Sequence, residues 1–412
     1  MTMAYTSQTA INEAIRRDWK GHIERELKGN ILPFWIKHAV DEANGGFYGA
    51  LSNDLVVDND VPRSAVLTAR ILWTYSTAYR SYGDERYLTM ARRAYDYLTQ
   101  KFWDHPFGGI YWTLDRHGQA INDRKHVYAQ AFAIYGLSEY YRATHEPESL
   151  QLAQELFRLI ETHSFDAVNG GNIECCSREW GALADMRLSE KEPECRKSMN
   201  TLLHLMEAYT NLLRVWPDEE LKVKQRGLIE IFLRRIINPH THHFKLFFDD
   251  EWRSLSDEIS YGHDIEGSWL IVEAAEVLSD ADLLAQARVE AVKMAQAVYR
   301  EGLDTDGAVL YAATPHGVTN DEKHWWVQAE AVVGFYNAYQ ISSQDHLAEA
   351  ALHLWDYIEA KFVDRTNGDW FKVLSRAGVP YAEHFKVGPW ECPYHHSRVC
   401  FEMLQRLNHT QE

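Results

Sequence analysis

Histidines recur at one position of a repeated pattern in this chain, the start of an apolar segment. Six such segments can be recognised, and five of them carry at least one histidine near their first residue. The polar and aromatic residues at the six starts are Arg63 and Arg70; Lys125, His126 and Tyr128; Asn200 and His204; His263 and Glu266; His324, Trp326 and Glu330; and Trp390, Tyr394, His395 and His396. Because the chain has only 20 histidines in 412 residues, random placement does not explain this set.

Proton transfer is the chemistry that this set favours. Imidazole titrates near neutrality and serves as a base or as an acid. Removal of a proton from a carbon beside a carbonyl needs a base on one face, an acid on the other, and a cation for the enediolate oxygen. Two or three of the histidines together with Arg70 meet these needs. For His126, His324 and His396 taken singly, a structural role fits the sequence equally well.

The same residues allow two other chemistries. Glycoside hydrolysis needs a pair of carboxylates, which Glu266 and Glu330 could supply, although hydrolysis does not require the histidines beside them. A metal ion could be bound by His204, His263 and His395. However, no local metal-ligand motif accompanies these three residues, so we predict no metal site.

The hexapeptide Tyr261–Glu266 opens an apolar run that continues through Ala275. This pattern predicts a buried helix with a polar first turn, at the positive end of the helix dipole. Glu266 follows His263 by three residues and therefore shares its face of the helix. We expect His263 to transfer protons and Glu266 to hold or tune it.

A glycine-containing turn followed by an aromatic-rich extended stretch occurs six times, mostly at intervals of about 62 residues. An amphipathic segment precedes each turn, and a segment that is apolar nearly all round follows it, as expected of outer and inner helices. The amphipathic segments are Ile11–Ala39, Glu85–Trp103, Glu148–His163, Glu219–Ile237, Asp280–Tyr299 and Asp345–Phe362. The apolar segments are Ser64–Tyr79, Val127–Tyr141, Met199–Leu213, Asp264–Leu278, Trp325–Tyr339 and His395–Leu407.

Six copies of outer helix, hairpin and inner helix predict an all-α fold, an (α/α)6 barrel with short β-hairpins at the active-site end. An open α-solenoid is the alternative, but the two-sided apolar inner helices and the lack of polar caps favour a closed ring. No linker-like stretch divides the chain, so we predict a single domain over residues 1–412. The polar starts of the inner helices should gather at the hairpin end.

Composition limits the partners of the chain. A formal charge of -18 argues against nucleic acid and anionic membranes. The sequence shows no signal peptide and no apolar run of membrane-spanning length, and its five cysteines lack zinc-ligand spacing. We therefore expect a cytoplasmic protein with reduced thiols. The 14 Trp and 22 Tyr residues suit a sugar site, because aromatic faces pack on pyranose rings.

Three stretches resemble the cellobiose 2-epimerases, a group within the N-acylglucosamine 2-epimerase family. They are Tyr261–Glu266, Trp325–Ala331 and Val387–His395. Shorter motifs around Arg70, Tyr128 and His204 fit the same family, and the resemblance runs from about Ile31 to Leu407. It implies a closed barrel that inverts C2 of a reducing-end glucose without a cofactor, through ring opening and a cis-enediol. The substrate would be cellobiose or a related β-1,4-linked disaccharide such as lactose.

The resemblance also implies roles for individual residues. His263 and His395 match the acid/base pair, His204 matches a histidine that assists ring opening, and Arg70 matches the arginine at the enediolate oxygen. Trp326 and Trp390 match aromatic platforms for the two sugar units. The remaining matches are Glu266 and Glu330, as carboxylates in the histidine network, and Tyr128 and Asn200, as substrate hydrogen-bonding positions.

The chain departs from the family pattern at two places. His396 stands where many relatives have Asn, and Glu192 lies in a loop, Leu188–Glu192, that in relatives covers the second sugar unit. A monosaccharide 2-epimerase or an aldose–ketose isomerase acting on mannose, glucose or N-acylglucosamine is therefore the alternative activity. A glycosidase and a non-enzymatic binding protein on the same scaffold are more distant ones. We expect a monomer or a weak homodimer.

Overall fold

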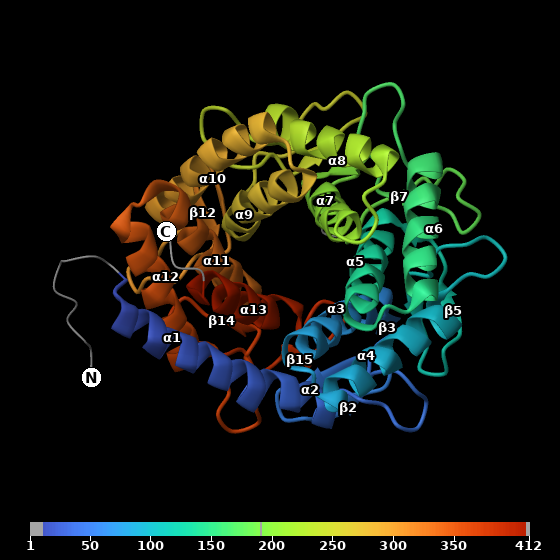
Figure 1. Ribbon diagram of the computed structural model, residues 1–412, viewed down its shortest axis with the longest axis horizontal. Coiled ribbons are helices and arrows are strands. Elements are labelled where there is room, and N and C mark those ends of the chain that lie inside the picture. Colours follow the sequence, from blue (N-terminus) through green and yellow to red (C-terminus); the bar gives the residue numbers. More distant parts are fainter. Residues whose placement is uncertain (1–10, 190–191, 409–412) are drawn as a thin grey trace.

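The computed structural model describes residues 11–189 and 192–408, which form a ring of inner helices inside a ring of outer helices (Figure 1). The inner helices are α3 (Ala65–Tyr82), α5 (Val127–Thr144), α7 (Met199–Leu213), α9 (Tyr261–Leu278), α11 (Trp325–Ser342) and α13 (Tyr394–Asn408). The outer helices are α1 (Glu13–Glu26) with α2 (Leu32–His38), α4 (Glu85–Tyr97), α6 (Pro147–His163), α8 (Glu219–Ile231), α10 (Ala281–Glu301) and α12 (Asp345–Tyr357). Four of the outer helices contain π-helical turns, at Leu27–Ile31, Leu98–Phe102, Phe232–Ile236 and Ile358–Phe362.

The inner helices are buried on nearly every face, as their composition predicts. The first fourteen residues of α3 and of α5 are all buried. In the outer helix α4, by contrast, the buried residues lie on one face of the helix. Each predicted segment corresponds to an observed helix with bounds that differ by a few residues. The prediction of an all-α (α/α)6 barrel is therefore confirmed. One domain over residues 1–412 stays a prediction, because residues 1–10, 190–191 and 409–412 lie outside the described part.

Short antiparallel strands join neighbouring repeats. They are β1 (Ala50–Ser52), β2 (Val57–Asp58), β3 (Arg63–Ser64), β4 (Thr113–Leu114), β5 (Ala120–Asn122), β6 (Lys125–His126), β7 (Cys175–Cys176), β8 (Lys197–Ser198), β9 (Phe247–Phe248), β10 (Ile259–Ser260), β11 (Ala312–Thr314), β12 (Gly317–Asn320), β13 (Lys323–His324), β14 (Val373–Leu374) and β15 (Phe385–Val387). The strand before each inner helix pairs with the turn of the next repeat, as β3 does with β4. Pairing of β15 with β1, and contact of α13 with both α11 and α3, close the ring.

The glycine turns are closed in the same way in all six repeats, although the turn of the fifth repeat, Leu303–Val309, is one residue shorter. An isolated bridge spans each turn, from Val40–Phe47 in the first to Val363–Trp370 in the last. Gly108 has φ +70°, and the equivalent position in the turn of the fourth repeat, His242, keeps this left-handed backbone with φ +62°. The degenerate fourth copy is thus a true member of the repeat.

A buried ion pair accompanies five of the six turns. An aspartate after the outer helix binds the cation of the strand before the inner helix, as Asp104 binds Lys125 at 2.9 Å. The other four pairs are Asp41–Arg63, Asp166–Lys197, Asp304–Lys323 and Asp364–Lys386. The fourth repeat has Asn238 and Ile259 at these positions and uses His243 instead, bonded to Asp264 and Glu301.

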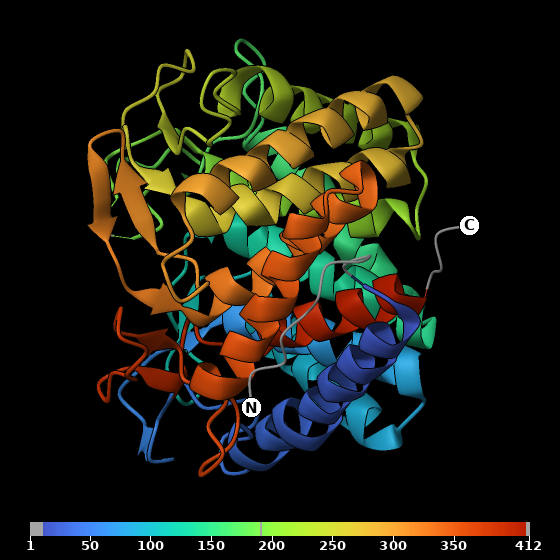
Figure 2. The ribbon, with the colours of Figure 1, turned by 90° about the vertical axis from the view of Figure 1, so that its left-hand side faces the viewer.

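All strands lie at the end of the barrel where the inner helices begin (Figure 2). The six inner-helix N-termini therefore share that end with the hairpins, as expected from the sequence. Within the described part of the chain, every helix is too short or too polar to cross a bilayer.

Candidate active site

Arg70 and Tyr128 face each other from the neighbouring helices α3 and α5. Arg70 Nη2 donates to the Tyr128 hydroxyl at 2.8 Å, and the guanidinium lies over the rings of Phe132 (4.1 Å) and Tyr394 (4.8 Å). Both side chains are 3% exposed. Arg70 is a buried cation without a carboxylate partner in the described residues, so it is suited to bind a developing oxyanion.

His204 lies beside this pair on α7. Its ring is 5.1 Å from that of Tyr128 and 4.7 Å from that of Phe132. Nδ1 is 2.9 Å from Glu207 Oε2, one helical turn further along α7. This bond fixes the orientation of the imidazole and directs Nε2 away from Glu207.

His263, half-buried in the first turn of α9, contacts two residues. Its Nδ1 is 2.7 Å from Ser260 Oγ, and its ring is 4.8 Å from that of Trp326. Burial, assisted by His204, lowers the pKa of His263 to about 3, so the imidazole is neutral and can accept a proton. The expectation that Glu266 holds His263 is wrong, because the serine before the helix takes that role and Glu266 turns toward α13.

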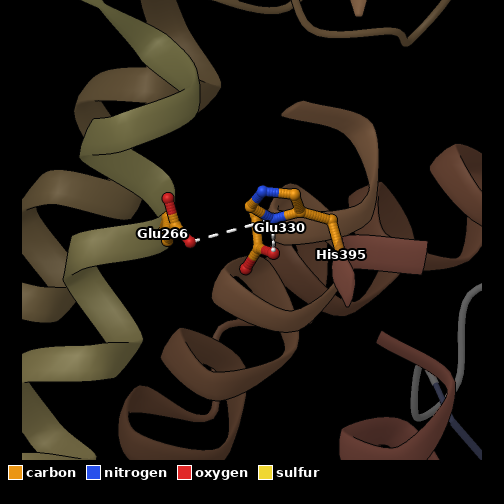
Figure 3. Close-up of side chains that lie close together, drawn as sticks. All are labelled: Glu266, Glu330 and His395. Atoms are coloured by element: carbon orange, nitrogen blue, oxygen red, sulfur yellow. Dashed lines mark hydrogen bonds and ion pairs between the residues drawn. The ribbon is translucent and has the colours of Figure 1, made fainter. Parts of the chain in front are cut away.

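His395, in the first turn of α13, is held from behind by carboxylates (Figure 3). Its Nδ1 lies 2.7 Å from Glu330 Oε1 and 3.8 Å from Glu266 Oε1. Burial, with the cations Arg70 and Arg398 nearby, lowers the pKa of His395 well below its usual value. The Trp326 ring, 5.6 Å from His395, also contacts His263, so one aromatic side chain touches both histidines.

Arg398 joins the groups behind the histidines. Its guanidinium donates to the carboxylates of Glu207, Glu266 and Glu330 and to the Tyr394 hydroxyl, and it is 1% exposed. The Tyr394 hydroxyl in turn donates to Glu207. A single cation thus connects the carboxylate of His204 with that of His395.

The charges of this cluster require bound protons. Three buried carboxylates surround one guanidinium, and burial raises the pKa values of Glu266 and Glu330 to about 7. Burial opposes ionisation of Glu207 as well, but Arg398 and His204 lower its pKa to about 2. Near neutral pH, Glu207 is therefore ionised, while Glu266 and Glu330 can hold a proton beside His395.

Sequence analysis did not identify Arg398 or Glu207 as site residues. Both lie three residues after a histidine of the set, as Glu266 does, in the spacings His204–Glu207 and His395–Arg398. The sequence did contain a signal for Arg398, since it lies in an inner helix that is otherwise largely apolar. A buried arginine is costly without a carboxylate partner, so its presence there predicts an ion pair.

The carboxylate cluster also bears on metal binding. In the described residues, the group with metal-ligand geometry is Glu266, Glu330 and His395, with ligand atoms within 4.8 Å of one another. It is not the trio of histidines considered from the sequence. Arg398 donates to Glu266 Oε1 and Glu330 Oε1, so a cationic group already neutralises this set.

Two groups of aromatic rings belong to the site, one around Trp390 and one around Trp326. Trp390 contacts Tyr128 (5.8 Å) and Trp112 (6.1 Å), while Tyr311 contacts Trp326 (6.3 Å). Trp326 and Trp390 are half-buried, so their faces are partly available. Asn200 Oδ1 is buried and bonds to no protein group in the described residues, which leaves it an acceptor for a ligand hydroxyl.

The remaining histidines of the set have other contacts. His126 caps α5 by accepting the Tyr128 amide at 3.3 Å, and His324 stacks on Tyr311 at 3.9 Å. His396 is fully buried, with Nε2 2.8 Å from Asp369 Oδ1, and packs on Trp370. These contacts agree with structural roles for His126 and His396.

Glu192, the other departure from the family pattern, accepts the Leu188 amide at 3.1 Å. Burial raises the pKa of its carboxyl, and Glu258 nearby adds to this effect. The intervening Glu190 and Lys191 lie outside the described residues.

Comparison with known proteins identifies the family. The profile of N-acylglucosamine 2-epimerases (GlcNAc 2-epimerases) matches residues 46–398. The chain is 45% identical over 386 residues to cellobiose 2-epimerase of Bacteroides fragilis, covering 93% of this chain and 98% of the relative. It is 39% identical over 389 residues to that of Dictyoglomus turgidum, covering 94% and 98%.

Solved structures agree with the sequence relatives. Cellobiose 2-epimerase from Bacillus thermoamylovorans superimposes with a TM-score of 0.90 at 39% identity, covering 95% of this chain and 100% of the relative. The family match, the near full-length relatives and the shared fold converge on one assignment. The chain belongs to the N-acylglucosamine 2-epimerase family.

Proposed function

We propose that this protein is a cofactor-independent epimerase that inverts C2 of the reducing-end glucose of cellobiose and related β-1,4-linked disaccharides. The observation that carries the proposal is the pair of histidines that both contact Trp326. Ring centroids of His263 and His395 lie 4.8 and 5.6 Å from that of Trp326, and they belong to different inner helices. Curated relatives at 35–45% identity that are named cellobiose 2-epimerase support the choice of substrate.

His263 and His395 exchange the C2 proton in this proposal. One neutral imidazole removes the proton from C2 of the opened sugar. The electrons of the C2–H bond form the C1–C2 double bond of a cis-enediolate, and Arg70 stabilises the negative charge that develops on O1. After rotation about the C2–C3 bond, the other histidine delivers a proton to the opposite face of C2. The C2–H bond broken and the C2–H bond formed balance, so no oxidant or reductant is needed.

Arg70 and His204 act on the sugar oxygens. Arg70, which is hydrogen-bonded to Tyr128, stabilises the negative charge on the enediolate oxygen. The guanidinium of Arg70 is buried in the folded protein, so its desolvation does not add to the barrier of the reaction. His204 is oriented through Glu207 and transfers a proton between the ring oxygen and O1 during ring opening and closure. Asn200 and Tyr128 hydrogen-bond substrate hydroxyls.

The carboxylate cluster supplies His395 with its proton. Glu330 is bonded to Nδ1 of His395, and the pKa values of Glu330 and Glu266 near 7 allow the pair to share a proton at neutral pH. A proton that reaches Nδ1 from Glu330 enables Nε2 to release one toward C2. Glu266, Glu330 and Arg398 are positioning residues in this scheme, since they act through His395.

The two aromatic groups favour a disaccharide. Trp326 would carry one sugar unit and Trp390 the other, with Tyr311 and Trp112 extending the two aromatic surfaces. A location in the cytoplasm and a monomeric or weakly dimeric state complete the proposal as predictions.

Product analysis tests the proposal. Cellobiose is incubated with the enzyme, and the products are separated and identified by NMR. We expect 4-O-β-D-glucosyl-D-mannose, with mannose, glucose and N-acylglucosamine turned over far more slowly. Faster conversion of a free monosaccharide, or a ketose as main product, would contradict the assignment and favour the monosaccharide epimerase or isomerase.

A further inference from the structure

A cavity of about 1260 Å³ opens at the end of the barrel opposite the candidate active site, where the inner helices end. We call it the rear cavity. Most of its lining comes from the C-terminal halves of the inner helices, including Thr77 and Arg80 of α3 and Asn211 of α7, and Lys20, Glu24 and Arg288 come from outer helices. Of the residues assigned to the candidate active site, only Glu207 contributes to it. The cavity is large enough for a disaccharide.

A buried layer separates this rear cavity from the active site. Glu207 lines the cavity, and it bonds Tyr394 and Arg398, which are 0% and 1% exposed. Glu207 also bonds His204 on the active-site side. The rear cavity is therefore a distinct space that reaches the catalytic network through one carboxylate.

Aromatic rings lie at the inner end of the rear cavity. Trp73 and Tyr135 stack with centroids 5.3 Å apart and an interplanar angle of 9°. Phe401 meets Trp73 edge-on at 6.2 Å. All three line the cavity, and since Trp73 and Tyr135 are 6% and 8% exposed, a ligand there would contact the exposed parts of these aromatic rings.

Most charged groups of the walls are paired with one another; of the others, Glu24 and Glu207 pair with cations outside the lining, and Lys20 bonds to Asn408. Glu139 accepts bonds from Arg80 and Arg142, Arg214 pairs with Glu273, and Arg288 pairs with Glu276. The lining has six cations and six carboxylates, the cations being Lys20, Arg80, Arg142, Arg214, Arg288 and Arg406, and the carboxylates Glu24, Glu139, Glu207, Glu273, Glu276 and Glu402. A charged ligand would have to break these pairs, whereas a neutral ligand rich in hydroxyls can bond to them as they stand.

Three buried polar atoms of lining residues lack a hydrogen-bond partner in the described residues: Thr77 Oγ1, Asn337 Nδ2 and Arg406 Nε. Thr77 and Asn337 are each only 4% exposed. Both residues line the cavity. Buried hydroxyl and amide groups normally have partners, so this pair offers bonds to a molecule in the cavity.

We propose that the rear cavity is a second binding site for a neutral sugar of mono- or disaccharide size. The sugar lies on Trp73 and Tyr135 and takes up the free hydrogen-bonding groups of Thr77 and Asn337. The site goes beyond the proposed function, because no residue of the proton-transfer pair contributes to it.

Equilibrium binding of cellobiitol, a reduced disaccharide that cannot open to an aldehyde, tests the proposal by calorimetry. The Trp326→Ala variant weakens binding at the active site, so the rear site dominates the signal. Thr77→Val and Asn337→Leu are near-isosteric, and each is added to Trp326→Ala. We expect Trp326→Ala to retain one class of sites and each added substitution to weaken it by about tenfold, the effect of one lost hydrogen bond.

Controls keep folding and function apart from the binding result. In the wild-type background Thr77→Val should keep the melting temperature and the turnover of cellobiose. Asn337→Leu also removes the bond that Asn337 Oδ1 accepts from Arg406 Nη1, so it should keep the turnover with a somewhat lower melting temperature. Loss of all binding in Trp326→Ala would overturn the proposal, as would binding that neither rear substitution changes. Failure of the proposed epimerase function shows in the product assay instead, which does not depend on the rear cavity.

Discussion

His243 provides a prediction whose size follows from the structure. It occupies the fourth repeat, where the other five repeats have an aspartate paired with lysine or arginine. Its Nδ1 lies 2.7 Å from Asp264 and its Nε2 3.0 Å from Glu301. Burial disfavours the imidazolium, but these two carboxylates outweigh that effect and raise the pKa of His243 to about 9. His243 is therefore a permanent cation at neutral pH, at the start of the helix that carries His263.

Replacing His243 with glutamine should lower stability in a pH-dependent way. A shift from the ordinary pKa of 6.5 to about 9 corresponds to about 3 kcal/mol of unfolding free energy. Because Glu301 is half-exposed, solvent screening reduces this to about 2–3 kcal/mol. Since the folded-state pKa is raised, the contribution is complete below pH 6.5 and is lost as the pH rises through 9.

Urea unfolding of the wild type and of His243→Gln, at pH 6 and at pH 9.5, measures this effect. The wild type should be more stable by about 2–3 kcal/mol at pH 6, and most of the difference should vanish at pH 9.5. His242→Asn is the matched control, since it removes a neighbouring histidine whose bond to Glu290 is partly exposed. A difference between wild type and His243→Gln that is equal at both pH values would refute the reasoning.

Three further predictions concern the catalytic network. In urea unfolding, Arg398→Leu should lower the free energy of unfolding by about 3–5 kcal/mol at pH 8. The loss should be smaller at pH 6, because the carboxylates left without a partner become protonated there. An equal loss at both pH values would contradict this prediction. Glu330→Gln should lower kcat by about 10²–10³-fold with little change in KM, because His395 loses its proton supply. In wild type, kcat should fall as the pH rises through about 7, where Glu266 and Glu330 lose their shared proton, and Glu330→Gln should shift this midpoint.

The architecture could be predicted because it depends on local patterns that recur. Glycine turns and apolar periodicity carry the repeat, and even the fourth copy keeps a left-handed backbone at His242 without a glycine. The ion pairs within the repeats, such as Lys125 with Asp104, were not predicted. Each pair links the turn after an outer helix to the strand before the inner helix of the same repeat, and the sequence does not show that these two segments meet.

The active site shows where sequence reasoning ends. A spacing of three residues brings His204 and Glu207 together, a contact that sequence analysis did not predict, whereas the same spacing does not bring His263 and Glu266 together. Glu207 and Glu266 both accept hydrogen bonds from Arg398, which belongs to the last helix of the ring. Which of two neighbours a buried carboxylate binds depends on where the nearest cation lies, and only the closed ring decides that.

Exchange of the C2 proton in single-histidine variants tests the central claim most directly. Cellobiose and 4-O-β-D-glucosyl-D-mannose are each incubated in heavy water with wild type, His263→Ala and His395→Ala, and deuterium at C2 is followed by NMR. The two-histidine mechanism predicts interconversion by wild type alone. Each variant should exchange the C2 proton of one epimer only, the two variants acting on different epimers. Interconversion at the wild-type rate by either variant would contradict the claim that His263 and His395 serve opposite faces of C2.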